Sequence, residues 1–203
     1  MKNTVKNAAN SVGFINSLKS AEWLASNTSI RLFGDAVLSA VCTDVATNEF
    51  ESESTQSIQD ELISTLTNYR KQTGLGRGLA ANQIGYSKRI VVVIFDAQCE
   101  VLYNPKVVET KGSASYWECC LSSGLLLLGE VIRPASGIFE YQQADGTVAT
   151  LEANFAQTRL LLHEIDHLNG VTCDQKYEPG TQRFVTGGKE EILSHPLTVI
   201  SES

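Results

Sequence analysis

The sequence predicts a domain in which strands pack against one buried helix near its C-terminal end. Three observations predict this arrangement. The segment Asn154–Asn169 carries leucine and isoleucine on most sides of a helix, so it should be buried. The run Ile90–Phe95 is rich in β-branched residues and is typical of a buried strand. Residues 137–141 and 147–151 flank Asp145-Gly146, and an Asp-Gly pair in that place predicts a β-hairpin.

The composition is that of a globular protein and excludes several classes. With 42% hydrophobic and 19% charged residues, the 203-residue chain is neither disordered nor dependent on disulfides. Sixteen basic residues against 23 acidic ones give a net charge of −7, so we expect no direct nucleic-acid binding, which needs clustered cations. No apolar run is long enough to cross a membrane, and we predict no membrane association.

The cysteines and the N-terminal segment bear on location. Five scattered cysteines, none in a C-x-x-C pair, predict free thiols or metal ligands in a reducing compartment. No apolar segment follows Lys2 and Lys6, and the arginines of a transit peptide are lacking. We therefore expect a cytoplasmic protein, with an organelle matrix as the alternative.

The other elements follow in chain order. Residues 1–29 are polar, and we set them apart as an N-terminal extension of unknown role. Residues 56–73 repeat apolar side chains at spacings of three and four, which predicts a helix that ends at Gly74. A glycine-rich loop covers residues 74–78. Asn104-Pro105 is expected to break the chain between two extended segments.

The buried helix carries the strongest chemical signal, the sequence HEIDH at residues 163–167. Helix positions i and i+4 share one face, so His163 and His167 point the same way and can hold one divalent metal ion. Glu164 stands beside His163 and can take a proton from a water on that metal. Chance is the alternative, but charged residues flanked by leucines on a buried helix would be costly without a purpose.

A hydrolytic metal site needs a third protein ligand, and the residues alone leave three options open. Cys173 would complete the metzincin protease spacing, with cysteine where the third histidine stands. Glu190 or Glu191 would match the thermolysin-like carboxylate of a following helix. Cys119 or Cys120 lies upstream, and in an extended segment only one of two adjacent thiols can face the metal.

A second segment, GRGLAANQIG at residues 76–85, strings small residues together and then places one amide side chain, Gln83. It lacks the Lys-Ser/Thr end of a P-loop, so that kind of phosphate site is excluded. Small residues such as Gly78 let a backbone run close to a ligand. Taken alone, the segment is more typical of an ordinary turn into a helix.

Together, three segments resemble one known family. GxGLAAxQIG at 76–85, ExCLS at 118–122 and HExDHLxG at 163–170 stand in the order of the peptide deformylase family, and the likeness covers about Ile30–Pro179. The resemblance implies an α+β fold, with mixed or antiparallel strands around a central metal-binding helix. The deformylase domain would span residues 30–180, followed by a C-terminal tail over residues 181–203.

The resemblance also implies an activity, a cofactor and a partner. The family removes the N-formyl group from N-formylmethionyl peptides of newly made proteins. It uses one divalent metal ion, Fe²⁺ in the native state and commonly replaced by Zn²⁺, Ni²⁺ or Co²⁺. The expected partner is an N-formylated peptide, on nascent chains at the ribosome.

Site residues follow from the matching positions. The implied metal ligands are Cys120, His163 and His167. Glu164 would be the general acid and base. Gln83 and the backbone N–H of Leu121 would donate to the oxygen that becomes negative in the tetrahedral intermediate. Substrate-binding residues are expected at Gly78, Arg77 and Glu118.

Three positions depart from the family's pattern. Cys119 replaces a glycine and would be strained if its backbone required positive φ. Leu162 replaces a glutamine before the first histidine. Arg77 replaces a hydrophobic residue near the methionine pocket, where it would favour a carboxylate-bearing substrate or else point to solvent. Downstream, Arg133 is expected to pair with Glu118 or Asp166, or to be solvated.

These departures keep two alternative functions open. One is a deformylase-fold amidohydrolase that acts on another N-formyl or N-acyl compound. The other is a non-catalytic member that binds a partner. The complete set of metal ligands, with Glu164 and Gln83, argues against the second alternative.

Overall fold

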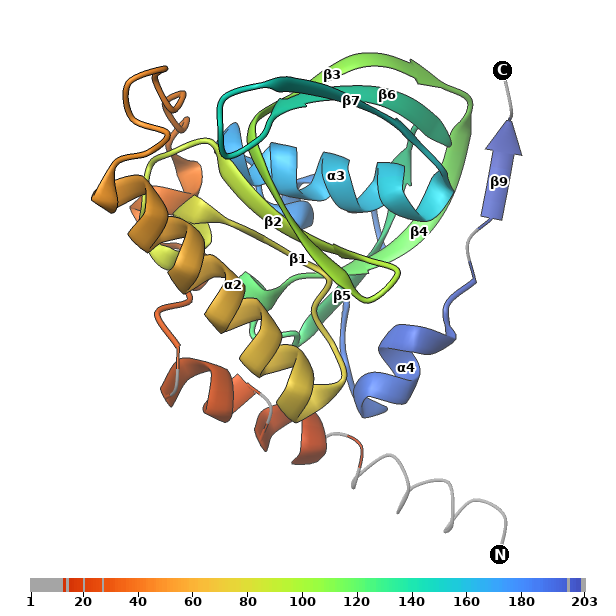
Figure 1. Cartoon of the computed structure of the whole chain (residues 1–203). Coiled ribbons are helices and arrows are strands. Elements are labelled where there is room, and N and C mark those ends of the chain that lie inside the picture. Colours follow the sequence, from red (N-terminus) through yellow and green to blue (C-terminus); the bar gives the residue numbers. More distant parts are fainter. Residues whose placement is uncertain (1–12, 14, 20, 27, 197, 202–203) are drawn as a thin grey trace, which may run out of the picture.

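The computed structural model describes residues 13, 15–19, 21–26, 28–196 and 198–201. Residues 1–12 of the predicted N-terminal extension lie outside this range. Two antiparallel sheets and the helices packed on them make up the described part of the chain, which confirms the α+β prediction (Figure 1). None of the described helices is long and apolar enough to cross a membrane.

The larger sheet has five strands in the order β1-β2-β3-β6-β7, and all neighbours are antiparallel. Its strands are β1 Gly78–Ala80, β2 Ile90–Phe95, β3 Gln98–Lys111, β6 Ser136–Gln142 and β7 Val148–Ala153. The run of β-branched residues forms β2 as predicted, and Gly146, with φ of 80°, lies in the predicted hairpin turn between β6 and β7.

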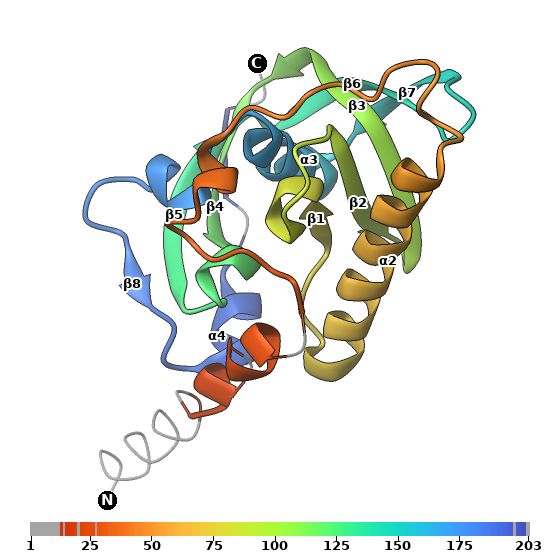
Figure 2. The ribbon, with the colours of Figure 1, turned by 90° about the vertical axis from the view of Figure 1, so that its left-hand side faces the viewer.

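Two long helices cover opposite faces of this sheet at β2. They are α2, Glu53–Thr73, and α3, Phe155–Leu168. Strand side chains alternate between faces, so Ile90, Val92 and Ile94 join a core with α2, and the residues between them join a core with α3. Figure 2 shows α3 and α2 on either side of β1 and β2. The histidine helix is therefore buried, as the sequence predicts.

Helix ends follow the sequence signals. The Ser52 side chain accepts from the N–H of Thr55 at the start of α2, and Gly74 ends that helix in the left-handed conformation. At the start of α3, Asn154 and Gln157 form the predicted capping box. The fixed start of α3 sets the positions of the residues on its inner face.

The smaller sheet has the strand order β8-β5-β4-β9. Its strands are β8 Arg183–Phe184, β5 Leu127–Arg133, β4 Ser113–Cys119 and β9 Thr198–Ser201. Two of these strands come from the segment 181–203, which also forms α4, Gly188–Ser194. The described part of this predicted tail thus packs on the same domain, with β9 beside β4 (Figure 1).

The described part of the chain also contains four short 3-10 turns: η1 Ala36–Ser39, η2 Ala81–Ile84, η3 Leu121–Ser123 and η4 Cys173–Lys176. Two of them matter for the site, because η2 contains Gln83 and η3 directly follows Cys120.

One sequence prediction about the strands is wrong. The expected break at Asn104-Pro105 does not divide two segments, because β3 continues through it with a register shift. Asn104 takes a positive φ of 49°, and its amide exchanges two hydrogen bonds with the backbone of Val45. These side-chain bonds hold the bend in place, and the backbone N–H of Asn104 donates to the Arg89 carbonyl at 2.8 Å, so β3 continues past the proline.

Candidate metal centre and active-site pocket

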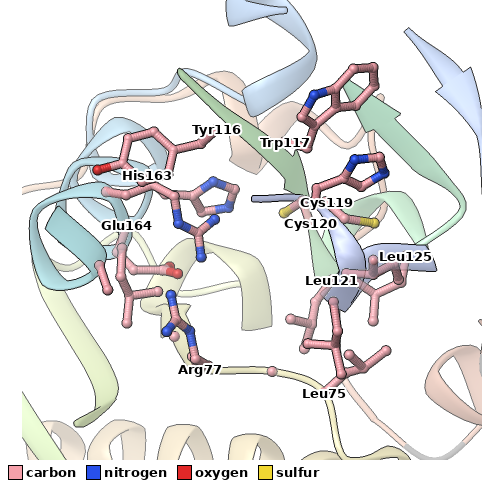
Figure 3. Close-up of a pocket in the computed structure, with 18 of the residues that line it drawn as sticks. Leu75, Arg77, Tyr116, Trp117, Cys119, Cys120, Leu121, Leu125, His163 and Glu164 are labelled. Carbon is pink, nitrogen blue, oxygen red and sulfur yellow. The ribbon is translucent and has the colours of Figure 1, made fainter. Parts of the chain in front are cut away.

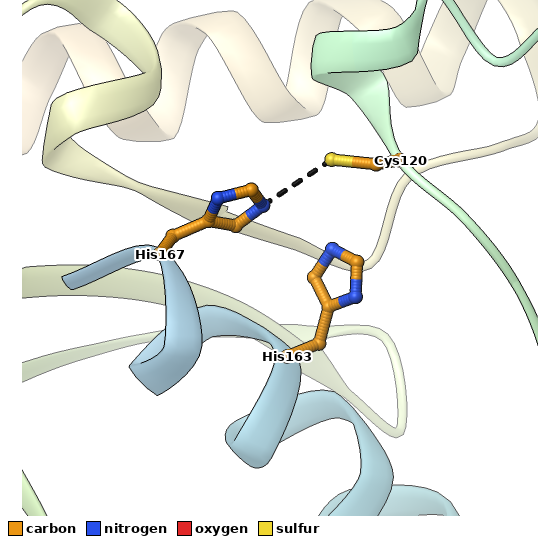
Figure 4. A group of neighbouring side chains, drawn as sticks. All are labelled: Cys120, His163 and His167. Atoms are coloured by element: carbon orange, nitrogen blue, oxygen red, sulfur yellow. Dashed lines mark hydrogen bonds between the residues drawn. The ribbon is translucent and has the colours of Figure 1, made fainter. Parts of the chain in front are cut away.

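Cys120, His163 and His167 bring their ligand atoms within 4.8 Å of one another, and all three are buried. The two imidazoles come from successive turns of α3, and the thiol comes from the end of β4 (Figure 4). Cys120 Sγ lies 3.2 Å from His167 Nε2. The structure thus brings together the three residues that the resemblance names as ligands.

The donor set fits a divalent transition metal. His163 Nδ1 lies 2.9 Å from a Glu118 carboxylate oxygen, which leaves Nε2 of that ring for a metal. Burial raises the pKa of the Cys120 thiol and lowers the pKa of His167. A buried thiolate therefore needs a positive charge beside it, and a neutral imidazole is the form that binds metals.

Behind the histidines lies a group of charges that we call the paired cluster: Glu118, Arg133, Asp166 and His163. Arg133 Nε and Nη2 donate to the two Glu118 oxygens at 2.7 and 3.0 Å, and Nη1 donates to Asp166 Oδ2 at 2.7 Å. Burial would raise the pKa of Glu118, but Arg133 and His163 hold it well below its usual range. Burial would lower the pKa of His163, but Glu118 raises it to about 9. The predicted pairing of Arg133 is confirmed with both acids.

Glu164 is 2% exposed, and its Oε2 has no hydrogen-bond partner among the described residues. Burial raises its pKa to about 7, against the opposing charges of His163 and Arg159. A Cβ atom at Gly78 would collide with this carboxylate, so only glycine allows β1 to pass so close. A carboxyl group of that pKa can both accept and donate a proton near neutral pH.

Gln83 reaches the centre from η2. Its Nε2 donates to Ser122 Oγ at 3.1 Å and lies 3.5 Å from Cys120 Sγ, and its Oε1 accepts from the Ala80 N–H at 2.9 Å. These contacts fix the amide beside the ligand thiol. Leu121 follows Cys120 directly, so its backbone also lies at the centre.

A pocket of about 750 Å³ opens beside the metal-binding group. Figure 3 shows Arg77 pointing into it on the side of Glu164 and His163, with Leu75 and Leu121 on the other side. Gly78 also lines the pocket. Glu118 does not line it: this residue is fully buried, and its carboxylate is used by His163 and Arg133. The sequence-based placement of Glu118 against the substrate therefore has to be revised.

Sequence reasoning missed two parts of the wall. Arg159 lines the pocket one helical turn before His163, and the i, i+4 spacing could have shown it. The segment 192–196 also lines the pocket, where His195 stacks on Trp117 with ring centroids 4.7 Å apart. Such a contact between distant segments leaves no local pattern in the sequence.

The other candidate ligands are not part of this group of three, although the Cys173 thiol lies next to that of Cys120. Cys119 lies in β4 and does not have a positive φ, so the expected backbone strain is absent. Its thiol points away from that of Cys120 (Figure 3). Cys173 is buried against the Tyr177 hydroxyl at 3.3 Å and is not part of the ligand group. Glu191 accepts from the backbone N–H groups of residues 186 and 187.

An α+β fold that buries one thiol and two imidazoles beside an unpartnered carboxylate has the features of a metal-dependent hydrolase. Comparison with known proteins identifies the family. The family model described as Polypeptide deformylase matches residues 28–183. The chain belongs to this family.

Relatives and solved structures agree. The peptide deformylase of Acetivibrio thermocellus is 35% identical over 150 residues, which cover 72% of this chain and 81% of that protein. Peptide deformylase 1 of Clostridium acetobutylicum is 36% identical over 143 residues, 70% of this chain and 89% of that protein. The crystal structure of peptide deformylase from Thermotoga maritima matches with a TM-score of 0.67 at 30% identity, covering 74% and 97% of the two chains.

Proposed function

We propose that this chain is a peptide deformylase that removes the N-formyl group from N-formylmethionyl peptides. One observation carries the proposal: Cys120, His163 and His167 converge within 4.8 Å, beside the unpartnered carboxylate of Glu164. The named relatives are all peptide deformylases, which supports this activity over the two alternatives, another N-acyl substrate or a non-catalytic role.

Cys120, His163 and His167 would hold one divalent metal ion. A thiolate with two imidazoles suits Fe²⁺, and also Zn²⁺, Ni²⁺ or Co²⁺. When bound, such an ion supplies Lewis acidity, which brings the pKa of water close to neutrality and stabilises negative charge on oxygen. Glu118 would support this ligand set, because it orients the ring of His163.

Glu164 would move the proton. In the reaction, water adds its oxygen to the formyl carbon and gives a proton to the Glu164 carboxylate. The C–N bond then breaks, the amine nitrogen takes that proton from Glu164, and formic acid is released, which gives up its own proton to solvent as formate. The raised pKa of Glu164, about 7, suits both steps near neutral pH.

Gln83 and the Leu121 N–H would donate to the oxygen that becomes negative. Contacts with Ser122 and Ala80 hold the Gln83 amide beside Cys120, so little reorganisation is needed during the reaction. This reaction would place the chain among the hydrolases that cleave the C–N bonds of linear amides but not peptide bonds. Because formyl groups are carried at the start of new chains, we propose that the protein acts on nascent chains, in the cytoplasm.

A formate-release assay on formyl-Met-Ala-Ser tests the activity. The protein as purified should release formate, and Glu164→Gln should lower kcat by about 10²- to 10⁴-fold with an unchanged metal content. A variant that binds metal and keeps its full rate would contradict the role of Glu164. Absence of formate release by the metal-loaded wild type would overturn the proposed activity itself.

Metal analysis tests the ligands with a matched pair of thiol variants. Cys120→Ser should lose the metal, because a hydroxyl is a poor ligand for these ions. Cys173→Ser removes the other buried thiol nearby and should keep one equivalent. The reverse result would move the third ligand to Cys173.

A further inference from the structure

Three arginines from different elements line the pocket. We call Arg70, Arg77 and Arg159 the open cluster. They come from the last turn of α2, the residue before β1 and the second turn of α3. Among the described residues that line the pocket, Glu164 is the only acidic one. The positive charges of the three arginines therefore outnumber the negative charges of the described residues that line the pocket.

Arg77 is the least satisfied member. Its side chain is half-buried, and it makes no hydrogen bond or ion pair with the part of the chain that the structure describes. Burial, and then the charges of Arg159 and Arg70, lower its pKa to about 10. Holding a partly buried cation beside like charges is unfavourable unless an anion joins them.

The other two arginines are only partly engaged. Arg70 Nη1 donates to the Gly76 carbonyl at 2.9 Å, which holds the loop that carries Arg77. Arg159 lies over the Tyr116 ring at 5.9 Å and 4.0 Å from Glu118. That carboxylate is already bound by Arg133, so it neutralises little of the Arg159 charge.

The position of the cluster tells which part of a substrate would meet it. Arg77 immediately precedes Gly78, which abuts the Glu164 carboxylate, and Arg159 stands one turn before His163. Figure 3 shows the Arg77 side chain directed toward the Glu164 side of the pocket. Two guanidinium groups therefore approach the reacting end of the substrate from two different elements.

We propose that Arg77 and Arg159 bind a carboxylate close to the formyl group, so that this chain prefers N-formyl substrates with an acidic group on one of their first residues. The inference rests on the proposed function. Guanidinium groups bind carboxylates through paired, charge-assisted hydrogen bonds, which supplies the preference.

Amidated peptides test this preference, because an amidated C-terminus removes the terminal carboxylate that would otherwise confuse the result. The probes are formyl-Met-Ala-Ser-amide, formyl-Met-Glu-Ser-amide, formyl-Met-Lys-Ser-amide and formyl-Glu-Ala-Ser-amide. At low salt, kcat/KM for the better of the two glutamate peptides should exceed that for the alanine peptide by about tenfold or more. The lysine peptide should be the poorest of the series.

Variants locate the source of the preference. Arg77→Met and Arg159→Met should each reduce the glutamate-to-alanine ratio toward one. The ratio is taken within each variant, so a general loss of rate does not affect it. Lys71→Met removes one exposed charge beside Arg70 on the same helix and should keep the wild-type ratio and rate.

The outcomes separate the two proposals. If the wild type hydrolyses the alanine peptide and shows no preference for glutamate in either position, the carboxylate site is wrong and the deformylase activity stands. If the preference exists but survives in both arginine variants, the assignment to Arg77 and Arg159 is overturned. If no formyl peptide is hydrolysed by the metal-loaded protein, the proposed function fails and the inference fails with it.

Discussion

Two groups of charges flank the Glu164 carboxylate, and they differ in one respect. In the paired cluster, Arg133 donates to both Glu118 and Asp166 at 2.7 to 3.0 Å. In the open cluster, Arg77 faces the pocket with no acidic partner among the described residues. Both groups include residues of α3, Arg159 in the open cluster and His163 and Asp166 in the paired cluster. The difference indicates that one group positions protein side chains and the other is arranged for a ligand.

Arg133 and Arg77 show the same contrast in their pKa values. Burial opposes the charged form of both. The carboxylates of Glu118 and Asp166 overcome this effect and raise the pKa of Arg133, whereas the neighbouring arginines add to it and lower the pKa of Arg77 to about 10. The charged form of arginine is therefore favoured at Arg133 and disfavoured at Arg77, because the neighbours of the two residues have opposite charges.

The largest expected effect is on the paired cluster. Arg133→Met should lower the free energy of unfolding by about 3–5 kcal/mol, because it leaves the buried Glu118 carboxylate without its main partner. Urea unfolding measures this loss. Lys106→Met breaks the exposed pair with Glu140 and should cost at most about 1 kcal/mol. Similar losses in the two variants would contradict a structural role for the paired cluster.

Glu118→Gln tests the link from the paired cluster to the metal. The amide keeps the shape of the carboxylate but binds the His163 ring more weakly, so metal affinity should fall about 10- to 100-fold. Competition with a chelator measures this change. Glu152→Gln, an exposed position on β7, serves as the control. Unchanged affinity in Glu118→Gln would show that the histidine is held by other contacts.

A smaller effect is expected at the start of α3, the helix that carries members of both clusters. Asn154→Ala removes the acceptor for the N–H groups of Ala156 and Gln157 and should cost about 1 kcal/mol of stability. Asn154→Ser keeps a capping oxygen and should retain most of that stability. Thermal unfolding measures both variants. If Asn154→Ala failed to bind metal under conditions in which it is fully folded, the cap would have more than a local role.

The smallest effect is expected in the open cluster. Arg77→Met removes a partly buried charge from beside like charges, so stability should stay within about 0.5 kcal/mol of the wild type or rise. The same urea unfolding experiment as for Arg133→Met gives a direct comparison. A loss of several kcal/mol would show that Arg77 has a structural partner and would remove the contrast between the clusters.

The sequence predicted those features that depend on local patterns. Asn154 and Gln157 mark the start of α3, β-branched residues mark β2, and the i, i+4 spacing places both histidines on one face. The motif around Cys120 predicted the thiol that joins them, through the resemblance to the family. The residues that make up each of these signals lie within a few positions of one another, so each signal can be recognised without knowing the fold.

Features that depend on tertiary contacts could not be predicted in the same way. The kink at Asn104 is stabilised by the backbone of Val45, 59 residues away. The sequence predicted that Arg133 could pair with Glu118, but not that this contact from β5 turns the Glu118 carboxylate away from the pocket. The pocket wall formed by His195 depends on its stacking against Trp117.

A crystal structure of the metal-loaded protein, with an anomalous map at the absorption edge of its metal, tests the central claim most directly. The account predicts one ion bonded to Cys120 Sγ and to one nitrogen each of His163 and His167, with the Glu164 carboxylate beside it. An ion bonded to Cys173 in place of Cys120, or no ion between the two histidines, would contradict it.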